Sequence, residues 1–262
     1  MTIISNLDKT ARKTYGKIQK KLPFLPQSPL KSKGLTKMRM KSNMQSFSDF
    51  NVRQILQFHL ENLESLQSHK DGLILGRYLE FLKQTDNLDG DILELGTYKG
   101  ISTICFAKFL DLIHSKKKIY TCDVFTGLPY EDKFSSSKNV KGEFGDTSLD
   151  FVKSQFTKFK VNDRIEIIPG LFEETLYQKI SNHRFSFVLV DCDIYDATKF
   201  CLPFIDERTN GIIAFDDYSK DKSIEAVWGE TKAVDEFVQE KNIELKIKPV
   251  PHINKGNVGL GD

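Results

Sequence analysis

From residue 91 onward, short apolar runs alternate with segments whose apolar residues recur every three or four positions. The runs are DILEL, KIYTCD, RIEIIPG, FSFVLVD and GIIAF, and a segment of helical period follows each of them. Five successive β-then-α units predict an α/β fold, with a Rossmann-like, doubly wound and mostly parallel sheet. The tail segments IELKIKP and GNVGL predict two further strands, which makes a seven-stranded sheet.

The residues before this region have helical periodicity and no strand pattern. ILQFHLENLESL and LILGRYLEFL, both within residues 51–84, place apolar residues three and four apart and predict two helices. We therefore divide the chain into an N-terminal arm at 1–45, a helical lead-in at 46–90 and the α/β domain at 91–262. The histidines, including His59 in the first of these helices, are interpreted as surface or capping residues.

Charge changes this picture at the N-terminus. Residues 1–45 hold eleven Lys and Arg against Asp8 alone, a local charge of +10, whereas the rest of the chain carries −8. Apolar residues recur at helical spacing from Ile3 to Leu22, which predicts a basic amphipathic helix that contacts an anionic membrane or a partner. A solvated, partly disordered tail is the alternative. The acidic body does not favour nucleic-acid binding.

Other features of composition indicate a cytoplasmic protein, with the arm as the segment that would touch a membrane. No apolar stretch has the length of a membrane span, and Lys9, Arg12 and Lys13 interrupt any signal-peptide core. The four cysteines show no CxxC pairing, so neither disulfides nor a zinc site is indicated. The two early helices offer a surface for a homodimer.

Acidic residues follow four of the five predicted strands. In open α/β sheets ligands bind at the carboxyl ends of the strands, so we expect these acids to form one rim. They are Glu94, Asp123, Asp191 with Asp193, and Asp216 with Asp217.

The turn after the first strand, residues 96–100, has glycines at both ends but no middle glycine. It therefore lacks the G-x-G-x-x-G of a dinucleotide site, and the chain has no P-loop GK[ST]. Glycines at such a turn suit a ligand with an amino acid moiety, and Asp123 is placed to accept hydrogen bonds from ribose hydroxyls. Together they indicate S-adenosylmethionine.

Asp216 and Asp217 raise a separate question, because two neighbouring anions repel unless a positive charge lies between them. Three carboxylates, with Asp191 as the third, suit Mg²⁺, which prefers hard oxygen ligands. A vicinal diol of an acceptor could fill two remaining positions on the ion. The alternative is a solvated pair that caps the following helix.

Five segments of the chain resemble the macrocin O-methyltransferase family. They are DILELGTYKGIST, TCDVFTGLP, IIPGLFEETL, FVLVDCDIYDAT and GIIAFDDY followed by AVDEF, in this order within residues 70–245. The family consists of class I, S-adenosylmethionine-dependent and metal-dependent enzymes that methylate sugar hydroxyls of natural products. The resemblance implies a magnesium ion among Asp191, Asp216 and Asp217. The implied cofactor-binding residues are Glu94, Gly96, Thr97, Tyr98, Gly100, Ser102, Asp123, Gly170 and Phe172.

The general base stays open at this point. Catechol- and caffeoyl-type methyltransferases place a lysine three residues after the first aspartate, where this chain has Ile194. Asp191 and Asp193 are the candidate catalytic proton acceptors, although Asp193 also suits the N-cap of a helix that begins near Tyr195. The long polar loop 131–146 is either a lid or a disordered insertion.

We therefore expect an S-adenosylmethionine- and Mg²⁺-dependent O-methyltransferase that acts on a hydroxyl of a sugar or glycosylated small molecule. The two alternatives are a non-enzymatic binding or assembly module with the same fold and a nicotinamide-dependent oxidoreductase. The acceptor cannot be assigned, because loops and the first 70 residues build its walls.

Overall fold

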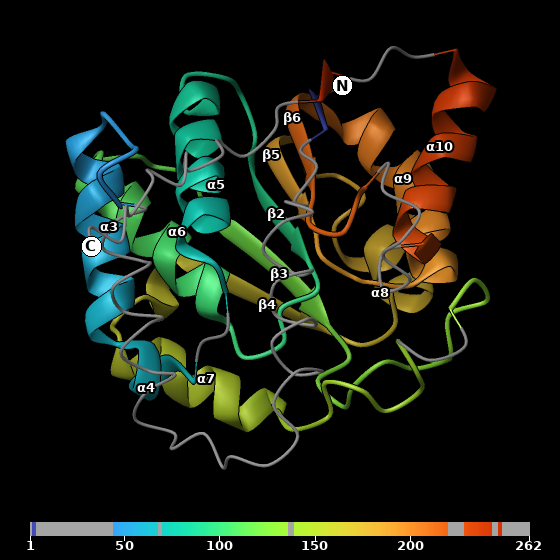
Figure 1. Ribbon diagram of the computed structural model, residues 1–262, viewed down its shortest axis with the longest axis horizontal. Coiled ribbons are helices and arrows are strands. Elements are labelled where there is room, and N and C mark those ends of the chain that lie inside the picture. The colour runs from blue at the N-terminus through green and yellow to red at the C-terminus, as the bar shows by residue number, and fades with distance from the viewer. Residues whose placement is uncertain are drawn as a thin grey trace, which may run out of the picture.

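The computed structural model describes residues 2–3, 44–67, 70–135, 139–219, 228–242 and 246–247. Five parallel strands of this part form one sheet in the order β4-β3-β2-β5-β6 (Figure 1). The strands are β2 (Asp91–Leu95), β3 (Ile119–Asp123), β4 (Ile165–Pro169), β5 (Phe185–Val190) and β6 (Thr209–Phe215). The strand order reverses beside β2, which confirms the doubly wound α/β fold.

The prediction of seven strands in this sheet is wrong for the described residues. IELKIKP contributes the two-residue strand β7 (Lys246–Ile247), which pairs in parallel with β1 (Thr2–Ile3) in a separate sheet. IELKIKP alternates charged with apolar residues, a pattern for a strand with one solvent-exposed face, whereas the inner strand β5 is buried at every residue. GNVGL lies outside the described residues.

Helices cover both faces of the sheet (Figure 1). The helices packed on one face, together with the short α4, are α3 (Phe50–Glu61), α4 (Leu63–Leu66), α5 (Gly72–Thr85), α6 (Ile101–Leu112) and α7 (Leu149–Lys158). The helices on the other face are α8 (Phe172–Lys179), α9 (Tyr195–Arg208) and α10 (Trp228–Lys241). A 3₁₀ turn, η1 (Asn162–Arg164), leads into β4.

Strand β5 shows how the two faces share one core. Phe187 and Leu189 pack with the helices of the α5 side, whereas Val188 and Val190 pack with α9 and α10. Side chains alternate across a strand, so a strand covered on both faces needs an almost unbroken apolar sequence. All six residues of FSFVLV are buried accordingly.

Aspartates fix where the lead-in helices begin. Asp49 accepts hydrogen bonds from the backbone N–H groups of Asn51 at 2.8 Å and Val52 at 3.2 Å, and Asp71 accepts one from Leu73 at 2.7 Å. The two helices predicted within residues 51–84 are present as α3 and α5, and a break at Asn62 separates α3 from the short α4. Because α3 and α5 share a core with α6, the boundary at residue 90 is a change in sequence pattern within that core.

The N-terminal arm is described only at Thr2–Ile3 and from Met44 onward. Its amphipathic helix therefore lies outside the described residues and stays a prediction. No helix in the described ranges is both long and apolar enough to cross a membrane.

His59 contradicts the interpretation of the histidines as surface or capping residues. It lies on the buried face of α3 with Val52, Ile55 and Leu56, and its side chain is fully inaccessible to solvent. Burial disfavours the imidazolium form and lowers the pKa of His59 to about 4. The folded protein therefore holds His59 neutral at pH values where the unfolded chain binds a proton.

This burial predicts a pH dependence of stability. Between about pH 6.5 and pH 4 the unfolded state binds more protons than the folded state, so stability falls as the pH falls, by about 3 kcal/mol from His59 alone. We expect His59→Leu to flatten the urea-unfolding free energy over this range, measured by circular dichroism. The matched control is His114→Asn at the exposed end of α6, which should keep the wild-type slope. An unchanged slope in His59→Leu would contradict the assignment.

Candidate active site

A cleft of about 470 Å³ opens at the carboxyl ends of the strands, beside the reversal of strand order, a volume typical of small-molecule sites. The predicted site residues that line it are Gly96, Thr97, Tyr98, Ser102, Asp123, Phe172, Asp191, Asp193, Asp216 and Asp217. Of the acids expected to form one rim, Asp123, Asp191, Asp193, Asp216 and Asp217 line this cleft, whereas Glu94 does not. Glu94, Gly100 and Gly170 do not line the cleft.

Gly96 brings the end of β2 against the end of β5. Its φ is +96°, and a Cβ at this position would lie 1.8 Å from the carbonyl oxygen of Asp191. The backbone N–H of Asp191 also donates to the carbonyl of Leu95 at 2.8 Å. Only glycine permits this approach, which places Asp191 beside the turn at 96–100.

Gly100 and Gly170 are explained by local backbone geometry. Gly100 is the N-cap of α6 with φ +77°, and a Cβ there would lie 2.6 Å from the ring of Phe156. Gly170 has φ +130°, and a Cβ would lie 2.9 Å from Thr175. Their assignment to the cofactor stays a prediction that no contact with the cleft supports.

Glu94 lies beneath the turn and is fully buried. Its carboxylate accepts hydrogen bonds from the hydroxyl groups of Ser102, Thr103 and Thr121. Burial raises the pKa of Glu94, and the three hydroxyl donors act in the opposite direction. In this structure the residue therefore holds β2, β3 and the first turn of α6 together.

Asp123 links the turn to the end of β3. Its Oδ2 accepts hydrogen bonds from the backbone N–H groups of Thr97 and Tyr98, both at 2.8 Å, and its Oδ1 accepts one from Phe125 at 2.7 Å. A carboxylate oxygen offers two acceptor positions, so Oδ1 keeps one for a ligand hydroxyl. The predicted ribose contact of Asp123 is thus compatible with its structural contacts.

A loop from another part of the chain closes over the turn. The hydroxyl of Tyr98 and the ammonium of Lys99 both bond to Asp146, at 2.5 and 2.7 Å, and the ring of Tyr98 contacts that of Phe144 edge-on. Three residues of the predicted lid, Asn139, Glu143 and Phe144, line the cleft. The loop therefore forms part of the cleft wall.

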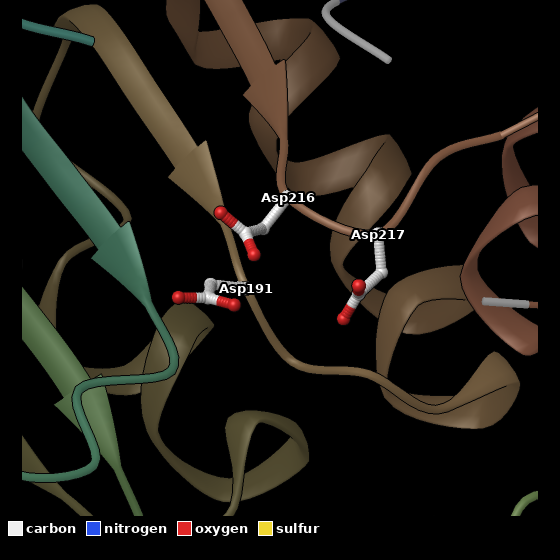
Figure 2. A group of neighbouring side chains, drawn as sticks. All are labelled: Asp191, Asp216 and Asp217. Carbon is white, nitrogen blue, oxygen red and sulfur yellow. The ribbon is translucent and has the colours of Figure 1, made fainter. Parts of the chain in front are cut away.

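The aspartates at the ends of β5 and β6 converge, as Figure 2 shows. Asp191 follows β5, Asp216 follows β6, and Asp217 is on the segment leaving β6. One carboxylate oxygen from each residue lies within 4.8 Å of the others. The predicted grouping of these three residues is confirmed as a juxtaposition.

Lys70, which the sequence analysis did not single out, lies in this cluster. Its ammonium is 2.5 Å from Asp191 Oδ2 and 3.0 Å from Asp216 Oδ1, and the hydroxyl of Tyr78 donates to the same Asp216 oxygen. Burial alone would lower the pKa of Lys70, but the two aspartates raise it well above its ordinary value. No sequence motif marks Lys70, since its partner Asp191 is 121 residues away.

The remaining acids make the cluster more negative than Lys70 can balance. Burial and the neighbouring Asp216 raise the pKa of Asp191 to about 8, and burial and Asp217 raise that of Asp193 well above its usual range. Glu230, fully buried on α10, accepts a hydrogen bond from the backbone N–H of Asp217 at 2.9 Å. Such raised pKa values mark an excess of buried negative charge.

The N-cap role predicted for Asp193 is wrong. Helix α9 does begin at Tyr195 as expected, but its N-cap is Ile194 and no side chain caps it. Asp193 has a φ of +62°, a left-handed conformation that is uncommon outside glycine, and it lines the cleft. Asp193 therefore lines the cleft, where its side chain is hydrogen-bonded to Asp217, and it does not start the helix.

The sequence matches the macrocin O-methyltransferase (TylF) family over residues 79–255, about two thirds of the chain. The chain belongs to this family. It is therefore an O-methyltransferase, which decides against the oxidoreductase and the non-enzymatic module. No curated protein matches the whole sequence significantly.

Solved methyltransferases have the same fold as this O-methyltransferase. CalS11, a calicheamicin methyltransferase, is 18% identical with a TM-score of 0.59, over 90% of this chain and 93% of CalS11. The O-methyltransferase NovP is 20% identical with a TM-score of 0.53, over 70% of this chain and 73% of NovP. At this level of identity the comparison establishes the fold.

Several cleft residues of this O-methyltransferase were not anticipated from sequence. Tyr130 and Glu173, joined by a hydrogen bond of 2.7 Å, form the wall beside Phe172. Glu173 directly follows Phe172, one of the implied cofactor-binding residues, so its position could have been inferred. Tyr130 is in a loop whose path no periodicity predicts.

Gly96 provides a test of the site's backbone geometry. We expect Gly96→Ala to lower the free energy of unfolding by about 3 kcal/mol or more, because its Cβ must push β2 away from Asp191. Gly142→Ala is the matched control: φ is +84°, but nothing lies within 4 Å of the added Cβ, so it should cost only about 1 kcal/mol. Both free energies of unfolding are measured by chemical denaturation. If the two variants lose equal stability, the positive φ alone requires glycine at position 96, and the close approach to Asp191 does not contribute.

Proposed function

We propose that this O-methyltransferase transfers a methyl group from S-adenosylmethionine to a hydroxyl of a sugar or glycosylated small molecule, with Mg²⁺ held by Asp191, Asp216 and Asp217. The observation that carries this proposal is the convergence of the three aspartates in the cleft that also contains the glycine turn. Donor and acceptor groups can therefore meet within one enclosure.

The donor fits the end of the cleft formed by β2 and β3. The turn at 96–100 presents Gly96, Thr97, Tyr98 and Lys99 to the amino acid moiety, and Asp123 Oδ1 has an acceptor position for a ribose hydroxyl. Leu171 and Phe172 supply an apolar wall for a purine, next to Tyr130 and Glu173. This arrangement supports the predicted order of the cofactor along the rim.

The three aspartates fit a hard divalent cation by their chemistry. All three donors are carboxylate oxygens, which Mg²⁺ prefers, and it holds such ligands at about 2.1 Å, so oxygens on opposite sides of the ion are about 4.2 Å apart. Neighbouring ligand oxygens of such an ion are about 3.0 Å apart, so the three oxygens, which lie within 4.8 Å of one another, would move inward when the ion binds. When bound, the ion would neutralise carboxylate charge and lower the pKa of an acceptor hydroxyl.

Asp193 is our candidate for the residue that takes the acceptor's proton. In the transfer, the hydroxyl oxygen forms a bond to the methyl carbon as the carbon–sulfur bond breaks, and the hydroxyl proton passes to the carboxylate of Asp193. Asp193 suits this role because it lines the cleft close to Asp191 and is not one of the three residues that would hold the ion. Asp191, the other candidate, would be occupied as a ligand of the ion.

The acceptor class rests on relatives and not on a contact in this cleft. CalS11 is described as a TDP-rhamnose 3′-O-methyltransferase of calicheamicin biosynthesis. A sugar hydroxyl with a neighbouring hydroxyl group is the acceptor that the aspartate cluster would favour, because a vicinal diol offers two oxygens to one ion. Membrane or partner contact through residues 1–45 and a homodimer stay predictions.

The metal site can be tested by an isosteric change. We expect Asp217→Asn to lower methyl transfer more than about 100-fold, because the amide removes one negative charge from the ion's ligands while keeping the side chain's shape. The measurement is release of S-adenosylhomocysteine with a panel of nucleotide sugars and glycosides, with EDTA and then with excess MgCl₂. Isothermal titration should show unchanged binding of S-adenosylhomocysteine.

The control for this test is Asp150→Asn, in the exposed first turn of α7 and away from the cleft, which should retain activity. Full activity of Asp217→Asn, or full wild-type activity in EDTA, would remove the ion from the proposal. If the wild-type protein does not bind S-adenosylhomocysteine, the proposed donor site is wrong.

A further inference from the structure

The ammonium of Lys70 lies where the grouped aspartates would hold a divalent cation. We infer that Lys70 is a tethered counter-ion for Asp191 and Asp216, which a divalent ion must displace in order to bind. This inference rests on the metal site of the proposed function. It adds to that site a competing group supplied by the chain itself.

The geometry shows why the two cations exclude each other. The Lys70 ammonium is 2.5 Å from Asp191 Oδ2 and 3.0 Å from Asp216 Oδ1, so it bridges two of the three prospective ligand residues. A magnesium ion bound at about 2.1 Å from the same carboxylate oxygens would be too close to the ammonium nitrogen of Lys70 for both cations to fit. It would also face a like charge at that distance in a half-buried site, where repulsion is strong.

The aspartate cluster needs a cation both in the metal-free and in the metal-bound protein. Asp191, Asp216 and Asp217 meet beside Asp193 and the buried Glu230. Without a positive charge, the carboxylates would repel one another or take up protons. Lys70 supplies that charge in this structure, and it thereby keeps Asp191 and Asp216 close together in the absence of metal.

The tether allows exchange without unfolding of the helix. Lys70 directly precedes Asp71, whose carboxylate caps α5 by accepting from Leu73 N–H. The backbone at this point is therefore fixed, whereas the lysine stem has four rotatable bonds and can swing within the cleft that it lines. Tyr78, from the same helix, donates to one oxygen of Asp216 and can remain there during the exchange.

The test compares Mg²⁺ binding to the full chain and to Lys70→Met, which keeps the stem and removes the charge. By isothermal titration with MgCl₂ alone, we expect Lys70→Met to bind at least about tenfold more tightly, because two charge-assisted hydrogen bonds no longer have to break. If Lys70 only maintained the structure of the cluster, Lys70→Met would bind Mg²⁺ more weakly than the wild type, which would contradict the inference. The matched control is Lys83→Met, which removes a lysine of α5 that is paired with Asp49 away from the cluster.

A second measurement uses the unaltered protein and so does not depend on folding of the variant. Acetic anhydride labelling, resolved by peptide mass spectrometry, should rise several-fold at Lys70 when MgCl₂ is added and stay unchanged at Lys83. Unchanged labelling of Lys70 at saturating MgCl₂, or equal Mg²⁺ affinity of wild type and Lys70→Met, would overturn the inference and leave the metal site standing. If neither protein binds Mg²⁺, both the exchange and the metal site fall, while S-adenosylhomocysteine binding still tests the donor site separately.

Discussion

The site depends on carboxylates that the fold brings together against their mutual repulsion. Parallel strands deliver Asp191 and Asp216 to the same edge of the sheet, and Asp217 and Asp193 follow directly. Apolar burial of β5 and β6 supplies the free energy that holds these strands side by side, so the acids cannot separate without loss of the core. The site is therefore built to accept positive charge, and its chemistry follows from that constraint.

The same constraint connects the helical lead-in to the catalytic region. Helix α5 packs with α3 and α6 on one face of the sheet; Tyr78 on this helix and Lys70, just before its N-cap Asp71, reach the aspartates. A segment that precedes the first strand of the sheet thus completes the wall of the cleft. In this O-methyltransferase the lead-in is part of the site's electrostatics as well as of the core.

Sequence reasoning worked where a short pattern determines the outcome. The five strands of the main sheet were predicted nearly to the residue because each is an apolar run that ends in a turn. The acids at their ends were placed by the rule that the carboxyl ends of parallel strands meet at one edge of the sheet. It failed where long-range packing decides. Lys70 has no periodic signal, and burial of His59 depends on neighbours from other helices.

The glycines show a subtler limit of sequence reasoning. Gly96, Gly100 and Gly170 all looked like ligand contacts, but only Gly96 lines the cleft. The other two serve the start of α6 and the turn before α8. A glycine in a sequence indicates a position where a side chain does not fit, but only the folded structure shows which neighbouring atoms would clash with that side chain.

The way loop 131–146 is attached has a consequence for how the cleft of such an enzyme can change. Its far end is fastened to the donor turn through Asp146, whereas Asn139, Glu143 and Phe144 face the cleft from the part in between. Phe144 both contacts Tyr98 and lines the cleft, whereas Glu143 lines the cleft and makes none of the contacts of Asp146. Substitution of Glu143 would therefore change the surface of the cleft while the contacts of Asp146 with Tyr98 and Lys99 remain.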